Sequence, residues 1–599
     1  MQNLTIIPSG GVVLFTIQVD GAPIPDMLTV DSVSITKSVN QIAKASITLL
    51  DGEIEWTKFD ASATSTFFPG SKITIQGGYD LQYETLFEGI ITSQSINVTE
   101  SGATLDIECS DSAVKMTVGR KSLTFSEQKD SDILTAIIGT YSGLTASVSV
   151  TPDVWPEQIQ HNATDWDFML TRAEANAMIV TTINGTVNVI SPIDDTTPVL
   201  YIGYGSGLIS FNAELSALKQ YGNVKASVWD YKTQAIVSVE SSNDMDGVGN
   251  LSASTLSEVA GLNDFVMQTT VPLETANMTN WINAQMIKST LSKIQGTTKF
   301  QGTNLVDPGK YISLQGLGER FSGNHIISAV THHFNDGNWL TDVSIGLSPE
   351  WFTEQQPDLM SPSASGMLPG ARGLFNGTVK QMHNDPETQY RILVDVPMFD
   401  ANGKGIWSRL SNFYSTNGAG AFFLPEVGDE VILGFLNEDP RYPIILGSVY
   451  SGTKQKPFAG LDPNEKNSIK AIVSKSGISV EFDDKNIVLT IATPDKNTII
   501  ISDKDKQITL QDENQNSIVM SSSGITIKSP KDINIQADQK INLTGMQGIT
   551  AQSSGGDIEL SGVNIKETAQ AQYSANGNAT AQVQGGAELV LKGGMVMIN

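Results

Sequence analysis

The sequence of 599 residues lacks the features of a cross-linked or membrane-embedded protein. Cysteine occurs once, as Cys109 in a strand-like run, so no disulfide can form within one chain and a buried reduced thiol is expected. No apolar run approaches the roughly 18 residues that a membrane-spanning helix needs. No lysine or arginine precedes Lys37, so the charged start of a secretory signal is missing. We therefore expect the chain to fold in a cytoplasm.

Basic residues are also scarce. The sequence has 37 Lys and Arg against 64 Asp and Glu, and its net charge is −27. Such a surface disfavours binding to nucleic acid, which depends on basic side chains. Residues 471–599 hold ten lysines and fourteen acidic residues, so most of the negative charge belongs to the front of the chain.

Aromatic residues almost disappear from the same segment. Residues 471–599 contain only Phe482 and Tyr573, although the whole chain has 21 Phe, 13 Tyr and 8 Trp. Without large apolar side chains, this segment cannot build an ordinary globular core. Some other arrangement must bury its apolar residues.

Short apolar pairs of the form Ile-x-Ile recur through this segment every eight residues. The two members of a pair point to one face of a strand and the residue between them to the other face. Turn-forming residues separate the pairs, as in the run Ser-Pro-Lys-Asp at 529–532. The pairs are Ile525 and Ile527, Ile533 and Ile535, Ile541 and Leu543, and Ile549 and Ala551.

One chain of this kind has a narrow apolar stripe with nothing to face. Three copies wound about a common axis would bury the stripes and leave no open sheet edge along the length. The sequence therefore predicts a homotrimeric, intertwined triple-stranded β-helix, a needle, over residues 456–599. The alternative is a monomeric parallel β-helix, whose coils typically need about 20 residues or more, against a period of eight here.

The front of the chain alternates in the manner of strands, with a few helical stretches. Residues 1 to about 125 predict a β-barrel, and a second barrel is expected to end near Pro349. Helices are expected at 130–141, 164–178 and about 277–294, the second with Thr164 as N-cap and with Trp166, Met169, Leu170 and Ala173 facing inward. Residues 1–355 are thus interpreted as one mainly β region with two barrels, and the Pro-, Ser- and Gly-rich residues 356–372 as a linker.

A small five-stranded barrel is predicted over residues 373–455, where Val, Ile, Phe and Trp are dense and turns recur every 8–12 residues. Its last part reads LPEVGDEVILGFLNEDPRYPIILGSVY at 424–450. Gly428 and Asp429 are expected to make one turn, and Pro440 and Pro443 to help make the next. The motif residues of this barrel are Pro425, Gly428, Asp429, Pro440, Pro443 and Gly447.

This run resembles the oligonucleotide/oligosaccharide-binding (OB) barrel of VgrG proteins and of contractile-phage tail spikes. The run HNATDWDFML at 161–170 and the segment from Tyr221 to Asp230 resemble the hub domain of the same family. So does the run from Gly323 to Leu347. The resemblance covers nearly the whole chain in the order hub, OB barrel and needle.

The resemblance implies a structural hub and membrane-puncturing spike at the baseplate of a contractile injection system. Its hub trimer would present six barrels to the sixfold tail tube protein and contact baseplate proteins. A PAAR-like protein would cap the tip formed by Met595, Val596, Met597, Ile598 and Asn599, and toxin effectors are possible cargo. Assembly would be cytoplasmic, with the particle then secreted, released or injected, so that a target membrane is contacted only on firing. The 20 residues 451–470 are too few for the lysozyme domain that some phage spikes insert there.

We expect no catalytic, cofactor or metal site. The five histidines His161, His325, His332, His333 and His383 have no metal-binding spacing, and His332 and His333 should point to opposite faces of one strand. The glycine-rich run at 203–207 lacks the Gly-Lys-Ser/Thr of a phosphate loop. The paired acids at 194–195 and 483–484 lie in polar turns.

Two rival functions remain open at this point. A trimeric tail fibre that binds receptors or degrades polysaccharide would need aromatic platforms or paired carboxylates on the shaft, where aromatics are almost absent. An enzyme-bearing spike would need an inserted domain.

Overall fold

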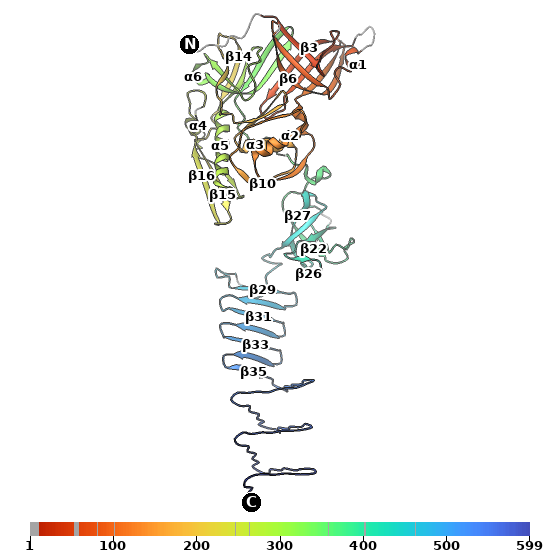
Figure 1. Ribbon diagram of the computed structural model, residues 1–599, viewed down its shortest axis with the longest axis vertical. Helices are drawn as coiled ribbons and strands as arrows, with labels where there is room; N and C mark the ends of the chain where they lie inside the picture. The colour runs from red at the N-terminus through yellow and green to blue at the C-terminus, as the bar shows by residue number, and fades with distance from the viewer. Residues whose placement is uncertain are drawn as a thin grey trace. The chain divides into compact units, whose positions relative to one another are not determined.

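The computed structural model describes residues 11–52, 59–80, 82–100, 102–245, 247–262, 264–357, 359–399, 403–459, 461 and 463–598. The chain divides into two compact units, residues 1–449 and 450–599. The chain is mainly β, as the sequence predicts, with 35 strands among the described residues. Figure 1 shows the course of the chain within each unit.

A sheet of 13 strands dominates the first unit, in the order β14-β18-β21-β20-β3-β4-β7-β6-β5-β1-β2, with β19 on β20 and β13 on β19. The two segments expected as barrels are thus hydrogen bonded to each other, because β20 pairs antiparallel with β3. Two separate apolar cores lie along this sheet, one around Ile47 and Phe87 and one around Phe300 and Val343. The strands are β1 Val13–Val19, β2 Ala22–Pro23, β3 Thr29–Ser38, β4 Lys44–Asp51, β5 Lys72–Tyr79, β6 Gln82–Thr99, β7 Gly102–Ser110, β13 Pro198–Gly203, β14 Leu208–Leu215, β18 Ile294–Gln301, β19 Tyr311–Gln315, β20 Gly323–Asn335 and β21 Asn338–Ile345.

A helical module follows the first seven strands, and two of the predicted helices form it. They are α2 Asp130–Gly139 and α3 Asp165–Ala175. The Thr164 hydroxyl accepts the Asp167 amide at 3.0 Å and donates to its carboxylate at 2.7 Å, which confirms the predicted N-cap. The four residues expected on the inward face of α3 are all buried. Strands β8 Lys121–Lys129, β9 Thr145–Val148, β10 Val154–Ala163, β11 Ile179–Ile183 and β12 Thr186–Ile190 complete the module.

The third predicted helix is α5, Thr275–Leu291, which packs on a three-stranded sheet. Met278, Ile282 and Met286 of α5 are buried against Val224, Ala226 and Val228 of that sheet. The sheet has the order β16-β15-β17, with β15 Asn223–Asp230, β16 Ala235–Ser242 and β17 Asp264–Thr269. The short helices are α1 Asp60–Ala63, α4 Ala253–Ala260, α6 Gly318–Phe321 and α7 Phe352–Gln355, and η1 Ser112–Thr117 is a 3-10 helix.

A closed five-stranded barrel ends the first unit, in the order β22-β23-β24-β28-β27. Its core includes Val379, Ile392, Val431 and Ile445. Its strands are β22 Phe375–Gln381, β23 Ile392–Asp395, β24 Ile406–Leu410, β27 Glu430–Phe435 and β28 Pro443–Ser448, with the small hairpin β25 Ser415–Thr416 and β26 Ala419–Gly420 between β24 and β27.

The linker segment is docked onto this barrel. The 3-10 helix η2, Ser363–Gly366, buries Ala364, and Ala371 donates its amide to the Glu438 carbonyl at 2.7 Å. Glu438 closes η3, Leu436–Glu438, and its carboxylate accepts from the Arg372 guanidinium at 3.1 Å. The proline-rich segment therefore has fixed contacts with the barrel, although its sequence shows no periodicity.

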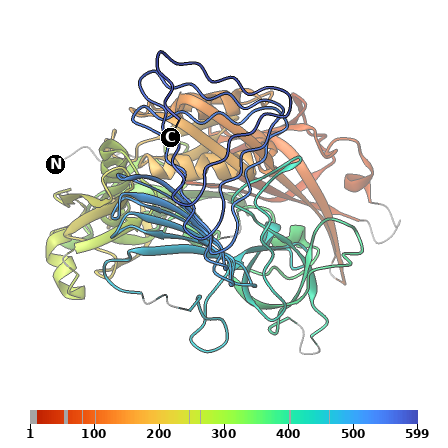
Figure 2. The same cartoon turned by 90° about the horizontal axis from the view of Figure 1, so that it is seen from below.

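The second unit opens with a sheet of seven strands in sequence order, each antiparallel to the next. It forms the ladder of Figure 1, and the view from below in Figure 2 shows its strands overlying one another. Hairpin loops of two to five residues join them, the lengths typical of such connections. The strands are β29 Ile469–Val473, β30 Ser479–Asp483, β31 Val488–Ala492, β32 Thr498–Ser502, β33 Gln507–Gln511, β34 Ser517–Ser521 and β35 Gly524–Lys528.

No strand is assigned between residues 529 and 598, all of which the structure describes. Of the predicted pairs, Ile525 and Ile527 lie on β35, whereas the pairs at 533–535, 541–543 and 549–551 have no strand partner within the chain. A strand needs a hydrogen-bonded neighbour, and one copy of this segment offers none.

Candidate functional site

The two faces of the seven-stranded sheet differ sharply in chemistry. The cross-strand register stacks the second and fourth residues of every strand into two columns on one face. The first column begins with Lys470 and continues with Phe482, Leu489, Ile501, Ile508, Met520 and Ile525, and the second holds Ile472, Val480, Ile491, Ile499, Leu510, Ile518 and Ile527. The other face is mixed: Thr, Ser and Gln alternate there with Val, Ala and charged residues, and Thr490, Ile500 and Thr509 lie in its middle column.

The apolar face is uncovered in a single chain. Ile499 exposes 40% of its surface, Ile501 42% and Leu510 37%, although such side chains are usually buried in a core. A groove of about 600 Å³ runs along the second column, and Ile491, Ile499, Leu510, Ile518, Ile527 and Ile533 line it. An apolar surface this continuous marks an interaction site.

The predicted needle residues beyond β35 are exposed as well. Ile533, Ile535, Ile541, Leu543 and Ile549 expose 49% to 72% of their surfaces. Their backbone makes no hydrogen bond to another backbone group within the described residues 529–598. Since backbone N–H and C=O groups in folded proteins are nearly all paired, this segment must obtain partners from outside its own chain or from water.

The predicted tip residues have exposed side chains. Met595, Val596, Met597 and Ile598 expose between 54% and 86% of their surfaces, and Asn599 lies outside the described residues. Among the described residues, none of the apolar clusters includes any of these four.

The motif residues singled out in the small barrel lie in or next to β27 and β28. Gly428, at φ +95°, donates its amide to the Val379 carbonyl at 2.8 Å, a conformation that favours glycine. The Asp429 carboxylate accepts the Glu426 amide at 2.8 Å and so closes the turn that begins with Pro425. Pro440 lies in the turn after η3, Pro443 opens β28, and Gly447 pairs with Ile432.

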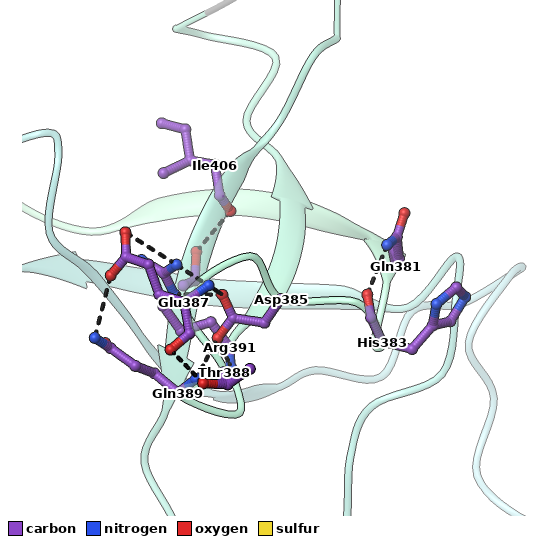
Figure 3. A network of polar contacts seen from close by, with 9 residues as sticks. Gln381, His383, Asp385, Glu387, Thr388, Gln389, Arg391 and Ile406 are labelled. Carbon is purple, nitrogen blue, oxygen red and sulfur yellow. Dashed lines mark hydrogen bonds and ion pairs between the residues drawn. The ribbon is translucent and has the colours of Figure 1, made fainter.

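A loop that the sequence did not single out carries the densest polar network of the barrel (Figure 3). Between β22 and β23, the Asp385 carboxylate accepts from the amides of Glu387, Gln389 and Arg391 at 2.7–3.1 Å. The Arg391 guanidinium donates to the same carboxylate at 2.6 and 3.0 Å. These bonds, that of Arg391 foremost, hold the pKa of Asp385 below its usual range. Tyr390, next to Arg391 in the same loop, is 81% exposed.

Two of the histidines, His332 and His333, lie side by side on β20. His332 is buried in β20, where its Nδ1 lies 3.1 Å from the Thr341 hydroxyl, and burial lowers its pKa to about 3. His333 points to the opposite face, as predicted, 3.4 Å from Asp342. Throughout the described ranges, no three His, Cys, Asp or Glu side chains gather as a metal site would require. Within the same residues, no helix is both long and apolar enough to cross a bilayer.

Sequence reasoning missed the apolar residues of β30 to β34. Their pairs recur every nine or ten residues, because the hairpin loops alternate between four and five residues, and a search for a period of eight begins only at Ile525. The signal was nevertheless present as Leu489-x-Ile491, Ile499-x-Ile501 and Ile508-x-Leu510.

Comparisons with known proteins agree with this architecture. The family described as the type VI secretion system/phage-baseplate injector OB domain matches residues 375–450. The phage baseplate V C-terminal trimerisation domain matches residues 486–569, which include five of the seven strands of the sheet. With the mainly β region before them, these domains define a VgrG-type spike protein of the type VI secretion and phage-baseplate class. The Alg8 N-terminal domain matches residues 9–336, more than half of the chain, and the chain belongs to this family.

Individual relatives are similar over short stretches. The type VI secretion system spike protein VgrG3 of Vibrio cholerae serotype O1 is 38% identical over 64 residues, 11% of this chain and 6% of that protein. Spike protein VgrG1a of Pseudomonas aeruginosa is 32% identical over 78 residues, 13% of this chain and 12% of the relative. The matched stretches thus span a small part of the relatives' own length. Among solved structures, the E. coli c3393 protein, described as a type VI secretion component, has a TM-score of 0.38 at 11% identity and covers 72% of this chain and 100% of its own.

Proposed function

We propose that this chain is a structural hub and spike at the tip of a phage-tail-like contractile injection system. Residues 1–355 form the hub, 356–372 the linker, 373–455 the OB domain and 456–599 the needle. The needle's uncovered apolar face carries the proposal, since a chain with that face open is incomplete alone.

The missing partners are two further copies of the same chain. The face has equivalent columns along its whole length, and its segment matches a trimerisation domain. Three such faces turned toward one axis bury each other and form a closed prism. The seven needle residues from Ile525 to Ile549 then continue the apolar interior downward, as the eight-residue period suggests.

The partners of the assembly follow from the class. The hub meets the tail tube and baseplate proteins and converts sixfold to threefold symmetry. A PAAR-like protein covers the apolar residues 595–598, and effectors bind to the spike and are transported with it. Sheath contraction drives the needle through a target membrane.

The role in this proposal is mechanical. The strongest polar clusters, such as Asp385 with Arg391, are saturated by internal hydrogen bonds and fix loops. The chain needs no catalytic residue, cofactor or metal for this work, and its negative charge disfavours nucleic acid as a partner. Assembly takes place in the cytoplasm, before the particle is secreted, released or injected. A polysaccharide-degrading fibre is less well supported, because Phe482 and Tyr573 are the only aromatics of residues 471–599.

The test is the mass of the purified full chain by size-exclusion chromatography with light scattering. We expect three times 64.2 kDa. A stable monomer at micromolar concentration would refute the spike assignment. In the strain that encodes the chain, deletion of its gene should abolish sheathed particles in electron micrographs, and normal particles would contradict the hub role.

A further inference from the structure

The needle consists of two sections that differ in whether their backbone groups form hydrogen bonds within one chain. Residues 469–528 form all seven strands within one chain. Residues 529–598 form none, although their apolar pairs continue the same pattern.

The turns explain this difference. Hairpins between β30 and β34 each contain a residue with positive φ, namely Ile487 at +55°, Lys496 at +66°, Lys506 at +52° and Gln515 at +69°. Such a residue lets the chain reverse tightly, so that consecutive strands pair antiparallel. After Gly524, the described residues include only one with positive φ, Gly548. Residues 529–598, the lower section, therefore form no such hairpins, although the chain bends about every eight residues.

Residues 469–528, the upper section, present a preformed docking surface. Loops closed by Asp483 and Asp512 hold its strands, since each carboxylate accepts two or more loop amides at 2.7–3.1 Å. Its two columns are apolar except for Lys470 at the head of the first, which forms an ion pair with Asp484. The groove lies along the second column only, so the surface presents a ridge beside a groove.

A second copy of this chain fits that surface best. Both columns belong to the same strands and share one spacing, so the first column of one copy can lie in the groove of the next with matching steps. When two different patches of identical chains contact each other, the chains form a closed ring if the rotation between neighbours divides a full circle. In the proposed homotrimer, three copies complete this ring. Asp512, Lys528 and Asp532 also line the groove, but the column that would be covered is apolar, which favours an apolar face as its partner.

We propose that residues 469–528 alone hold the three copies together and set their register, and that residues 529–598 take their strand partners from the other copies only after this contact has formed. This inference rests on the proposed homotrimer. It adds an order of assembly: the upper section associates first, and the lower section then winds downward from it.

Matched aspartate substitutions in the full chain test the proposal. Ile499→Asp places a charge in the groove of the upper section, and Ile541→Asp places one in the lower section. We expect Ile499→Asp to elute as a monomer and Ile541→Asp to remain a trimer. Trypsin should cleave the Ile541→Asp trimer after Lys531 and Lys540 at least tenfold faster than it cleaves the wild type. Thr490→Asp, on the opposite face, serves as a control and should remain trimeric.

The outcomes distinguish a failure of this inference from a failure of the proposed spike function on which it rests. If the wild type is a trimer and Ile541→Asp is a monomer, the upper section does not suffice and the inference fails, while the spike assignment stands. A trimeric Ile499→Asp variant would show that the groove is not the interface. If Ile499→Asp loses its β-sheet circular dichroism, Ile499→Ala decides instead: it should lower the association constant at least tenfold, whereas Ile541→Ala should change it less than threefold. Equal effects of the two alanine variants overturn the inference.

Discussion

Three consecutive isoleucines of β32 allow a sharp test of which face of the sheet is the interface. Ile499 and Ile501 belong to the apolar columns, whereas Ile500 points to the opposite face. We predict that Ile501→Ala weakens association of the three copies and that Ile500→Ala does not. The two variants remove the same atoms from nearby positions of one strand. Ile500→Ala therefore controls for the effect of shortening an isoleucine side chain as such.

The magnitude follows from the exposed area. Full burial of an isoleucine stabilises by about 1.5–3 kcal/mol, and Ile501 still exposes 42% of its surface in one chain. Covering the rest therefore contributes roughly 0.6–1.3 kcal/mol per copy, or about 2–4 kcal/mol in a trimer. Because 1.4 kcal/mol is tenfold in an equilibrium constant, the association constant should fall roughly 30- to 700-fold.

Sedimentation at graded urea concentrations is a suitable assay, because the wild-type trimer will not dissociate on simple dilution if it is tight. We expect the midpoint of dissociation to fall for Ile501→Ala and to stay within the error of the wild type for Ile500→Ala. An equal fall for both variants, or a larger one for Ile500→Ala, would refute the assignment of the apolar face as the interface.

Two further predictions concern the first unit. His332 is buried with its pKa lowered to about 3, so the unfolded chain binds this proton more readily than the folded one. Its contribution to the hub's unfolding free energy is therefore complete above the ordinary pKa near 6.5 and falls by about 1.4 kcal/mol per unit below it, down to pH 3. The urea unfolding of His332→Gln should lack this part of the pH dependence, and identical pH profiles would contradict the reasoning. In the OB barrel, Asp385→Asn should speed hydrogen exchange at the amides of Glu387, Gln389 and Arg391 at neutral pH. The reason is that the carboxylate is a stronger hydrogen-bond acceptor than the amide oxygen that replaces it. The low pKa of Asp385 means that this stabilisation persists above the ordinary pKa and is lost only as the pH falls through the lowered value. Glu387→Gln is the matched control, and equal exchange rates in the two variants would count against the role of Asp385.

Local patterns predicted several elements well. The N-cap Thr164 and the inward residues of α3 follow from side-chain spacing and hydrogen-bonding chemistry that act within a few residues. The closed barrel at 375–448 was predicted from dense β-branched residues and regular turns. The sheet β15 to β17 was not resolved in advance beyond a resemblance at residues 221–230, since its pairing joins segments about 40 residues apart.

The needle shows where sequence and structure contribute differently. The scarcity of aromatic residues and the repeated apolar pairs were enough to show that one copy of residues 471–599 has no core of its own, because burial area can be counted from composition. The direction of each turn could not be read from the pairs, because it depends on backbone dihedrals at residues such as Ile487 and Lys496, which are not typical left-handed residues. Only the tertiary structure therefore decided that the strands pair within one chain as far as Lys528 and that the apolar columns extend up to Ile472. It also decided that β20 joins β3 across nearly 300 residues. Contacts of such sequence separation arise from packing of the whole chain, which no local pattern specifies.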